Sequence, residues 1–451
     1  MTEIESWMQF IEHSPTSYHT VDQVIKRLKK GGFVCLDENT NKKPNQAGYF
    51  ISKNGSIIAF LLPRIKIQNT PSFRIWGAHT DSPSLHVKPI CEINKKGYQM
   101  ISTEVYGGAI LSSWLDRPLG MAGKVYVQKN NKKNQKGIEE KLLFINDPLM
   151  VIPHAAIHLN REVNKQFSIN KATHLNALFS NRNESLNSIL SQHIGCKAKD
   201  ILSHDLFLVD IEPPKIFGRE KQFINSPRLD NLAMVHAGLE GFLKVAEQQN
   251  KLDAKKTKSQ DSIIPAVVFF NHEEVGSQTY QGALSNFLTQ ALIEILQLTQ
   301  SARNKNQTSS EKYFYDCLAK SFMISADMAH GFHPNFESLY DENHRPILNQ
   351  GLVIKYNANQ RYATDGSSSA IIKQIMLNHQ LPYQEYVQQA EIPCGSTIGP
   401  LVSSQLGIPT VDIGSAMLAM HSIRETAGIQ DHLYAIQLAE KFLSHESIEI
   451  Q

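Results

Sequence analysis

The stretch AVVFFNHEEVGS, at 266–277, places two adjacent carboxylates, Glu273 and Glu274, directly after an apolar run. Neighbouring like charges are common in solvated loops. At the end of a buried strand they can instead divide two tasks, with one carboxylate binding a metal ion and the other moving a proton. The ends of the other apolar runs decide between these two interpretations.

Three other apolar runs also lead to side chains that can bind metals. These are FRIWGAHTD with His79 and Asp81, SFMISAD with Asp327, and VDIGSAMLAMHS with His421. SPRLDN adds Asp230 directly before a predicted helix. Each residue alone has a simpler explanation: an Asp before a helix is commonly an N-cap, and a single His among eighteen is weak evidence. Because ligands bind at the carboxyl ends of strands in open α/β sheets, the whole set predicts one convergent site.

The predicted chemistry is that of a dinuclear metal hydrolase. Two divalent ions about 3.5–4 Å apart share a bridging carboxylate and activate a water. The expected metal ligands are two histidines and three carboxylates: His79, Asp230, Glu274, Asp327 and His421. A ligand set of this kind, without thiolates, suits zinc and also cobalt or manganese. We expect Glu273 to be the general base, and Asp81 to accept the other imidazole N–H of His79 and fix its tautomer.

Alternating elements predict an α/β fold, a mostly parallel sheet with flanking helices. A single helix is expected over 4–30, ending at Gly31-Gly32. Strands are predicted over 56–62, 73–81, 266–271, 321–327, 352–357 and 409–414. Two further helices are predicted over 230–249 and 399–407. The segment 91–220 is richer in extended stretches, which predicts a β-rich domain inserted into a catalytic domain formed by 1–90 and 221–451.

Composition restricts the class of protein. The 451 residues are 41% hydrophobic and 20% charged with a formal net charge of +2, which predicts a soluble enzyme without a basic face for nucleic acid. The chain has no run of 18 apolar residues, so no helix is predicted to span a membrane. The N-terminus lacks a secretory pattern and the five cysteines are scattered, which favours a cytoplasmic location.

Other catalytic motifs are weak or missing. The chain has no GxSxG, no GxxxxGK[ST] and no HExxH motif. The glycine-rich CGSTIGP, at 394–400, is either a turn before a helix or a source of backbone N–H groups for a substrate oxygen. A nucleophilic role for Cys394 lacks an obvious partner base.

Ten sequence blocks, taken together, resemble the M18 family of metalloaminopeptidases, and most closely its aspartyl aminopeptidase-like bacterial members. They are GAHTDSPSL, EVYGGA, IHLNR, RLDN, HEEVGS, SADMAHGFHPN, ENHRP, VIKYNANQRYAT, CGSTIGP and AMHSIRE. The blocks occur in the family's order and extend nearly from end to end of the chain.

The resemblance implies removal of N-terminal residues from peptides, with acidic residues preferred. It also implies two metal ions, typically zinc. His79, Asp230 and Asp327 would hold one ion, and Asp230, Glu274 and His421 would hold the other, with Asp230 bridging. Glu273 would be the general base, in agreement with the assignment made from the residues.

Further expectations come from the resemblance alone. His158 would reach the active site of a neighbouring subunit, where substrate contact is preferred and metal binding is the alternative. Lys355 would face the acidic side chain of the substrate, a role that an extra negative charge at Asp365 would weaken. The family fold implies that the inserted domain mediates dimerisation within a dodecameric shell.

Two alternative functions stay open at this point. One is a related dinuclear hydrolase acting on another amide, such as a deacetylase or a carboxypeptidase, which would not require a free N-terminus. The other is a catalytically inactive shell protein. The presence of all five expected ligands and the base speaks against the second alternative.

Overall fold

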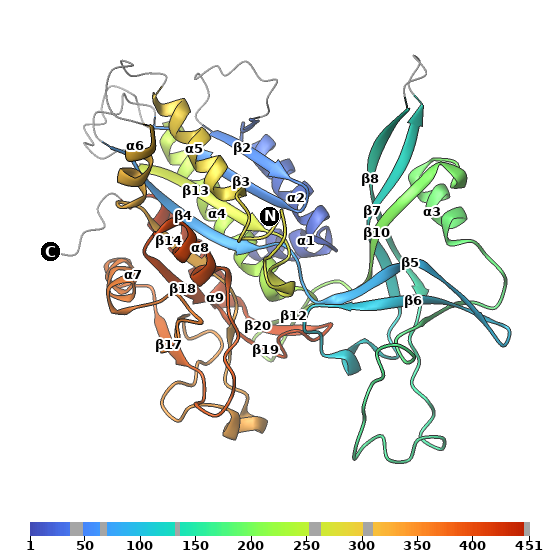
Figure 1. Cartoon of the computed structure of the whole chain (residues 1–451). Coiled ribbons are helices and arrows are strands. Elements are labelled where there is room, and N and C mark those ends of the chain that lie inside the picture. The colour runs from blue at the N-terminus through green and yellow to red at the C-terminus, as the bar shows by residue number, and fades with distance from the viewer. Residues whose placement is uncertain (37–47, 64–69, 131–135, 252–262, 301–309, 446–451) are drawn as a thin grey trace.

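The computed structural model describes residues 1–36, 48–63, 70–130, 136–251, 263–300 and 310–445 (Figure 1). Its largest sheet has nine strands in the order β1-β2-β3-β13-β4-β14-β18-β16-β17. Four neighbouring strands are parallel: β13 (Ile263–Phe270), β4 (Ser72–His79), β14 (Phe322–Ala326) and β18 (Thr410–Gly414). The flanking strands include antiparallel pairs: β1 (Val34–Cys35), β2 (Gly48–Lys53), β3 (Ser56–Leu61), β16 (Leu352–Tyr356) and β17 (Tyr383–Val387). The six predicted strands are therefore confirmed, with their bounds within three residues.

Helices cover both faces of this sheet, because successive side chains of a strand point to opposite sides. Val267 and Phe269 of β13 join one core cluster, and Val268 and Phe270 join the other. The first cluster packs against α1 (Glu3–Glu12), α2 (Ser17–Lys30), α4 (Leu229–Lys251), α7 (Gly366–Asn378) and α9 (Ile429–Leu443). The second packs against α5 (Phe287–Gln300), α6 (Ser310–Leu318) and α8 (Ile398–Leu406). The predicted α/β domain is thus a helix–sheet–helix sandwich (Figure 1).

The single helix expected over 4–30 is wrong. The structure has two helices, α1 and α2, separated at Ser14-Pro15-Thr16. Proline lacks a backbone N–H, and its ring collides with the carbonyl four residues earlier, so Pro15 ends the first helix. Thr2 caps α1 through a hydrogen bond from the backbone N–H of Glu5.

A second sheet of six antiparallel strands stands to one side of the sandwich (Figure 1). Its order is β8-β7-β10-β5-β6-β9, and α3 (Leu186–Ile194) packs near it. The strands are β5 (Ser84–Lys95), β6 (Tyr98–Tyr106), β7 (Leu119–Asn130), β8 (Lys136–Met150), β9 (Ala177–Ser180) and β10 (Ile201–Asp210). An α/β domain with a β-rich companion is therefore confirmed, while the boundaries at 91 and 220 stay a prediction.

A third, small sheet lies between these two parts. Its strands run in the order β11 (Lys215–Phe217), β12 (Phe223–Ser226), β20 (Glu425–Gly428), β19 (Ala416–Leu418) and β15 (Ala329–His330). It fixes the chain on both sides of His421, which lies between β19 and β20. Among the residues that the structure describes, no helix has the length and apolar character needed to cross a membrane.

Candidate metal centre

The strand ends converge as the sequence predicts. His79 is the last residue of β4, and Asp327 follows its parallel neighbour β14. Glu273 and Glu274 lie in a short 3₁₀ turn after β13, which is the other neighbour of β4. Since the carboxyl ends of these parallel strands lie at one edge of the sheet, their side chains meet there.

Asp230 offers one carboxylate oxygen to each of two histidines. Its Oδ1 lies 3.2 Å from Nε2 of His79, and its Oδ2 lies 3.5 Å from Nε2 of His421. The first histidine also lies 3.5 Å from Asp327 Oδ1. The second lies 3.4 Å from Glu274 Oε2. These contacts define two three-residue groups that share Asp230, and in each group the potential ligand atoms lie within 4.8 Å of one another.

The chemistry of these groups fits two divalent ions. Two imidazoles and three carboxylates supply nitrogen and oxygen ligands, which suit zinc, cobalt or manganese. Asp230 Oδ1 and Glu274 Oε1 are buried, and neither oxygen accepts a hydrogen bond with good geometry from the described residues. Buried carboxylate oxygens without donors are costly unless a cation faces them. The fold therefore brings together the five residues that the sequence proposes as ligands, and a third group, of His79, Glu273 and Glu274, includes the proposed base.

Charge crowding sets the proton affinities around Glu273. Burial raises the pKa of Glu273 to about 8; nearby His79 lowers it, and the charges of Asp327, Asp81 and Asp230 add to the rise. Burial also raises the pKa of Glu274 well above its usual value, and the charge of Asp230 contributes. A carboxylate with a raised pKa near neutrality is suited to accept and return a proton.

The histidines respond to the same carboxylates in the opposite direction. Burial opposes protonation of His79, but its contacts with Asp230, Asp327 and Asp81 raise its pKa well above the usual value. Burial likewise opposes protonation of His421, whereas contact with Asp230 and the charge of Glu274 raise its pKa to about 10. These shifts measure the strong negative potential that the cluster presents to any cation.

Asp81 supports the site differently from the sequence expectation. The Nδ1 atom of His79 lies 3.1 Å from the backbone carbonyl of Asp81 and 3.5 Å from its carboxylate. The carboxylate accepts the hydroxyl of Tyr106 at 2.7 Å and the backbone N–H groups of Glu273 and Glu274 at 3.1 Å each. Asp81 therefore fixes the turn that carries both glutamates, and its backbone orients His79.

Glu425 is a supporting residue that the sequence did not identify. Its carboxylate is buried and accepts the backbone N–H of Asp230 at 3.0 Å and that of His421 at 2.7 Å. Burial raises the pKa of Glu425 to about 8, with a contribution from the charge of Asp230. The only sequence signal was its position four residues after His421, within the block AMHSIRE.

An open cavity of about 390 Å³ lies over the cluster. Its wall includes Lys355, which is 2% exposed, contrary to the exposed lysine that its sequence context suggests. The Nζ atom of Lys355 donates to the carbonyls of Asp327 at 2.9 Å and Met328 at 3.2 Å, and it lies 5.1 Å from the ring centre of Tyr362. An ammonium has three donors, so these two hydrogen bonds leave one donor of this cavity-lining lysine for another partner.

Asp365 does not line this cavity. It is the N-cap of α7, and its carboxylate accepts the backbone N–H of Ser368 at 2.7 Å. CGSTIGP forms the turn before α8 and its first three residues, and Gly395, Ser396 and Thr397 of the turn lie in the cavity wall. The extra charge expected to weaken binding at Lys355 is thus engaged in capping a helix.

His158 lies apart from the cluster. It is exposed in a turn between β8 and β9, within the part of the chain that carries the second sheet. None of the three metal-competent groups among the described residues includes it. Its expected contact with a neighbouring subunit stays a prediction.

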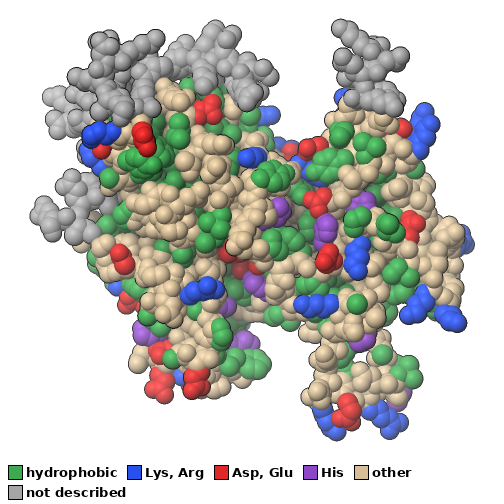
Figure 2. All heavy atoms as spheres, viewed as in Figure 1, with side chains coloured by type: hydrophobic (Ala, Val, Ile, Leu, Met, Phe, Trp, Pro, Cys, Tyr) green, Lys and Arg blue, Asp and Glu red, His purple; other side chains and the backbone are tan. Residues whose placement is uncertain are grey.

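Figure 2 shows where acidic and histidine side chains gather in the groove beside the second sheet.

Comparisons with known proteins cover nearly the whole chain. Residues 10–443 match the family model described as aminopeptidase I zinc metalloprotease (M18). A probable M18 family aminopeptidase 2 from Clostridium novyi is 38% identical over 96% of this chain and 97% of its own. An aspartyl aminopeptidase from Dictyostelium discoideum is 36% identical over 98% of this chain and 96% of its own.

Solved structures give the same picture. A chain in a cryo-EM structure of the Ape4 and Nbr1 complex is 34% identical, with a TM-score of 0.88 over 98% of this chain and 85% of that chain. The mApe1 dodecamer from S. cerevisiae is 26% identical, with a TM-score of 0.81 over 98% of this chain and 96% of that chain.

Proposed function

Because the chain belongs to the M18 family of zinc aminopeptidases, we propose that it removes acidic residues from the N-termini of peptides. The aminopeptidase class follows from the family, whereas the acidic preference and the dinuclear mechanism are the proposal. One observation carries it: Asp230 directs separate oxygens at His79 and His421, beneath a cavity whose wall contains the ammonium of Lys355.

Five residues would hold two ions, zinc by preference. His79, Asp230 and Asp327 would bind one ion, and Asp230, Glu274 and His421 the other, in keeping with the two groups that the fold assembles. When bound, such ions polarise the scissile carbonyl and make a water acidic enough to react near neutral pH.

Glu273 is the proposed general base. It lies next in the chain to Glu274, and its Oε2 is 4.0 Å from Nε2 of His79. From there its carboxylate can take the proton from the attacking water and return it to the leaving amine. Asp81 is the positioning residue for this step, because it holds the backbone N–H groups of the turn.

Lys355 is the proposed selector for acidic side chains. A buried ammonium in the cavity wall pairs with a carboxylate much more strongly than a surface lysine does, because water screens it less. A substrate with N-terminal Asp or Glu would place its side-chain carboxylate there. A neutral side chain would leave the remaining donor of Lys355 without a partner.

The assembly is proposed by analogy. One related structure is a dodecamer, and we propose a homo-oligomer of the same kind, in which His158 reaches the active site of a neighbouring subunit and contacts substrate. The exposed position of His158 leaves it available for such a contact. A cytoplasmic location and the lack of a nucleic-acid partner stay predictions.

The test is a comparison of initial rates on matched peptides that begin with Asp, Glu, Leu or Lys, with the Glu273→Gln variant as the blank. Faster turnover of the Asp and Glu peptides, and none by the variant, supports the proposal. Leading turnover of the Leu peptide would contradict the acidic preference. An N-acetylated Asp peptide distinguishes a deacetylase or carboxypeptidase, because an aminopeptidase needs the free amine.

A further inference from the structure

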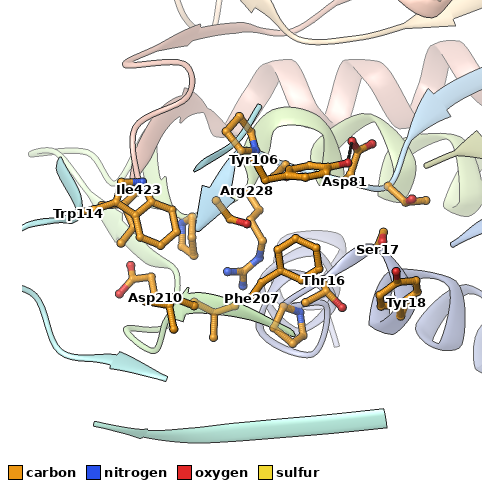
Figure 3. Close-up of a pocket in the computed structure, with 18 of the residues that line it drawn as sticks. Thr16, Ser17, Tyr18, Asp81, Tyr106, Trp114, Phe207, Asp210, Arg228 and Ile423 are labelled. Atoms are coloured by element: carbon orange, nitrogen blue, oxygen red, sulfur yellow. Dashed lines mark hydrogen bonds between the residues drawn. The ribbon is translucent and has the colours of Figure 1, made fainter. Parts of the chain in front are cut away.

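A second cavity, of about 40 Å³, is lined by chain neighbours of the proposed metal ligands, such as Asp81 and Arg228, and it shares no lining residue with the substrate cavity. Figure 3 shows its walls, which come from the start of α2, from β10 and from the segment before α4. Since one water requires about 10–15 Å³ on this measure, the cavity holds about three water-sized positions.

Arg228 is the unusual residue of this cavity. Its guanidinium points inward, toward the space between Phe207 and Asp210 (Figure 3). Its Nη2 donates to the carbonyl of Ile11 at 3.3 Å, while its buried Nε donates to nothing in the described part of the chain. A guanidinium has five N–H donors, so most of those of Arg228 are unused.

By contrast, all five N–H donors of the neighbouring Arg424 form hydrogen bonds. It donates five hydrogen bonds, to Asp210, to the carbonyls of Glu212 and Pro213, and to both oxygens of Asn225. Asp210 is therefore engaged by Arg424, and no carboxylate among the described residues forms an ion pair with Arg228. The fold pairs one of these two cations directly with a carboxylate. The other faces a cavity, with the charges of Asp210 and Glu425 nearby.

The remaining acids in the wall are also engaged. Asp81 accepts Tyr106 and two backbone N–H groups, and Glu425 accepts two backbone N–H groups. A second buried donor of the wall, Nε1 of Trp114, has no partner in the described chain, and Oδ1 of Asn271 is the unpaired acceptor. Most of the free hydrogen-bonding capacity is therefore that of donors, and it centres on Arg228.

We propose that this cavity binds a small monocarboxylate, whose two oxygens pair with the guanidinium of Arg228. The planar fork of a guanidinium matches a carboxylate. Trp114, Phe207 and Ile423 provide apolar walls for a short hydrocarbon tail. The carboxylates of Asp81, Asp210 and Glu425 in the wall repel any anion, and they repel a dianion such as phosphate about twice as strongly as a monoanion, so phosphate fits poorly.

The location gives such a ligand access to the back of the metal centre. Asp81 and Glu425, which line this cavity, hold the backbone of four residues of the catalytic cluster. A bound carboxylate would contact the support of the ligands without entering the substrate cavity. Its binding is therefore expected to change kcat at saturating peptide and to leave KM unchanged.

The experiment is calorimetric titration of the metal-loaded, full-length protein with sodium acetate at constant ionic strength. The expected result is saturable binding that is at least about tenfold weaker in Arg228→Met, as loss of charge-assisted hydrogen bonds implies. Arg182→Met, which removes an exposed arginine of the other domain, is the matched control and should bind as the unaltered protein does.

Phe207→Trp is the second variant, because it fills the cavity while every arginine and every proposed metal ligand of the chain is retained. It should abolish binding, and it decides the matter if Arg228→Met does not fold. Acetate binding that persists in Phe207→Trp would place the anion on the metals and overturn the proposal. So would an absence of saturable binding, or chloride binding as tightly as acetate. These outcomes do not depend on peptide specificity.

Discussion

Asp81 and Glu425 are buried carboxylates that support the two sides of the same metal centre in the same way. Asp81 accepts the backbone N–H groups of Glu273 and Glu274, and Glu425 accepts those of Asp230 and His421. Neither side chain belongs to the proposed ligand set. Together they fix the positions from which the base and three of the ligands extend.

The support from Glu425 predicts a loss of metal affinity in Glu425→Gln. A neutral amide has one acceptor oxygen in place of two, so Asp230 and His421 lose their common anchor. Changes to groups that orient metal ligands typically cost about 10–100-fold in metal affinity. Competition with a fluorescent zinc chelator would measure the loss.

Glu391→Gln is the control for this variant, because Glu391 is exposed and lies outside the cavity over the metal ligands. It should retain zinc as the unaltered protein does. Equal zinc affinity in Glu425→Gln and the unaltered protein would show that the two backbone hydrogen bonds do not position the ligands.

Lys355 predicts a change in specificity. Lys355→Met keeps most of the length and volume but removes the ammonium from the cavity wall. Turnover of peptides beginning with Asp should fall about 10–100-fold in kcat/KM, which is the worth of a charge-assisted hydrogen bond, while Leu peptides change much less. The ratio of kcat/KM for matched Asp and Leu peptides is the measurement.

The control is Lys373→Met, which removes a cation that pairs with Glu385 outside the cavity. It should leave the Asp-to-Leu ratio unchanged. If Lys355→Met lowers both rates equally, Lys355 acts by holding the carbonyls of Asp327 and Met328, and the selector lies elsewhere.

A buried histidine pair predicts acid sensitivity far from the metal centre. His236 Nδ1 lies 3.0 Å from His432 Nε2, and the ring of His432 stacks on Trp7 at 3.8 Å. Burial lowers the pKa of His432 to about 3, and burial together with the charge of His432 lowers that of His236. An unfolded histidine binds a proton near pH 6.5, so the unfolded state gains protons first as the pH falls.

Their contribution to stability is therefore complete above about pH 6.5 and is lost as the pH falls toward the folded values. Each histidine contributes a slope of about 1.4 kcal/mol per pH unit in this range. His432→Gln should reduce the change in the urea unfolding midpoint between neutral and acidic buffers. Both the variant and the unaltered protein are measured in the metal-free form. His379→Gln, at an exposed position, should not reduce this change, and equal slopes in all three proteins would contradict the account.

Much of the fold and the ligand set could be predicted, because local patterns carry them. The apolar runs that end at His79, Glu273 and Asp327 are buried strands, and neighbouring parallel strands bring their ends together. Tertiary contacts decided the rest. Glu425 acts on the backbone of Asp230, 195 residues away in the chain, and no local pattern marks such an acceptor. Lys355 resembled a surface lysine until its strand was placed beside the cavity.

The central claim is that Glu273 is the general base and Glu274 is a metal ligand. Metal content measured together with turnover tests this claim most directly. Glu273→Gln should bind two ions per chain and be inactive, whereas Glu274→Gln should lose one ion, because Glu274 faces His421 and Asp230. Loss of metal in Glu273→Gln, with full occupancy in Glu274→Gln, would show that the two roles are reversed.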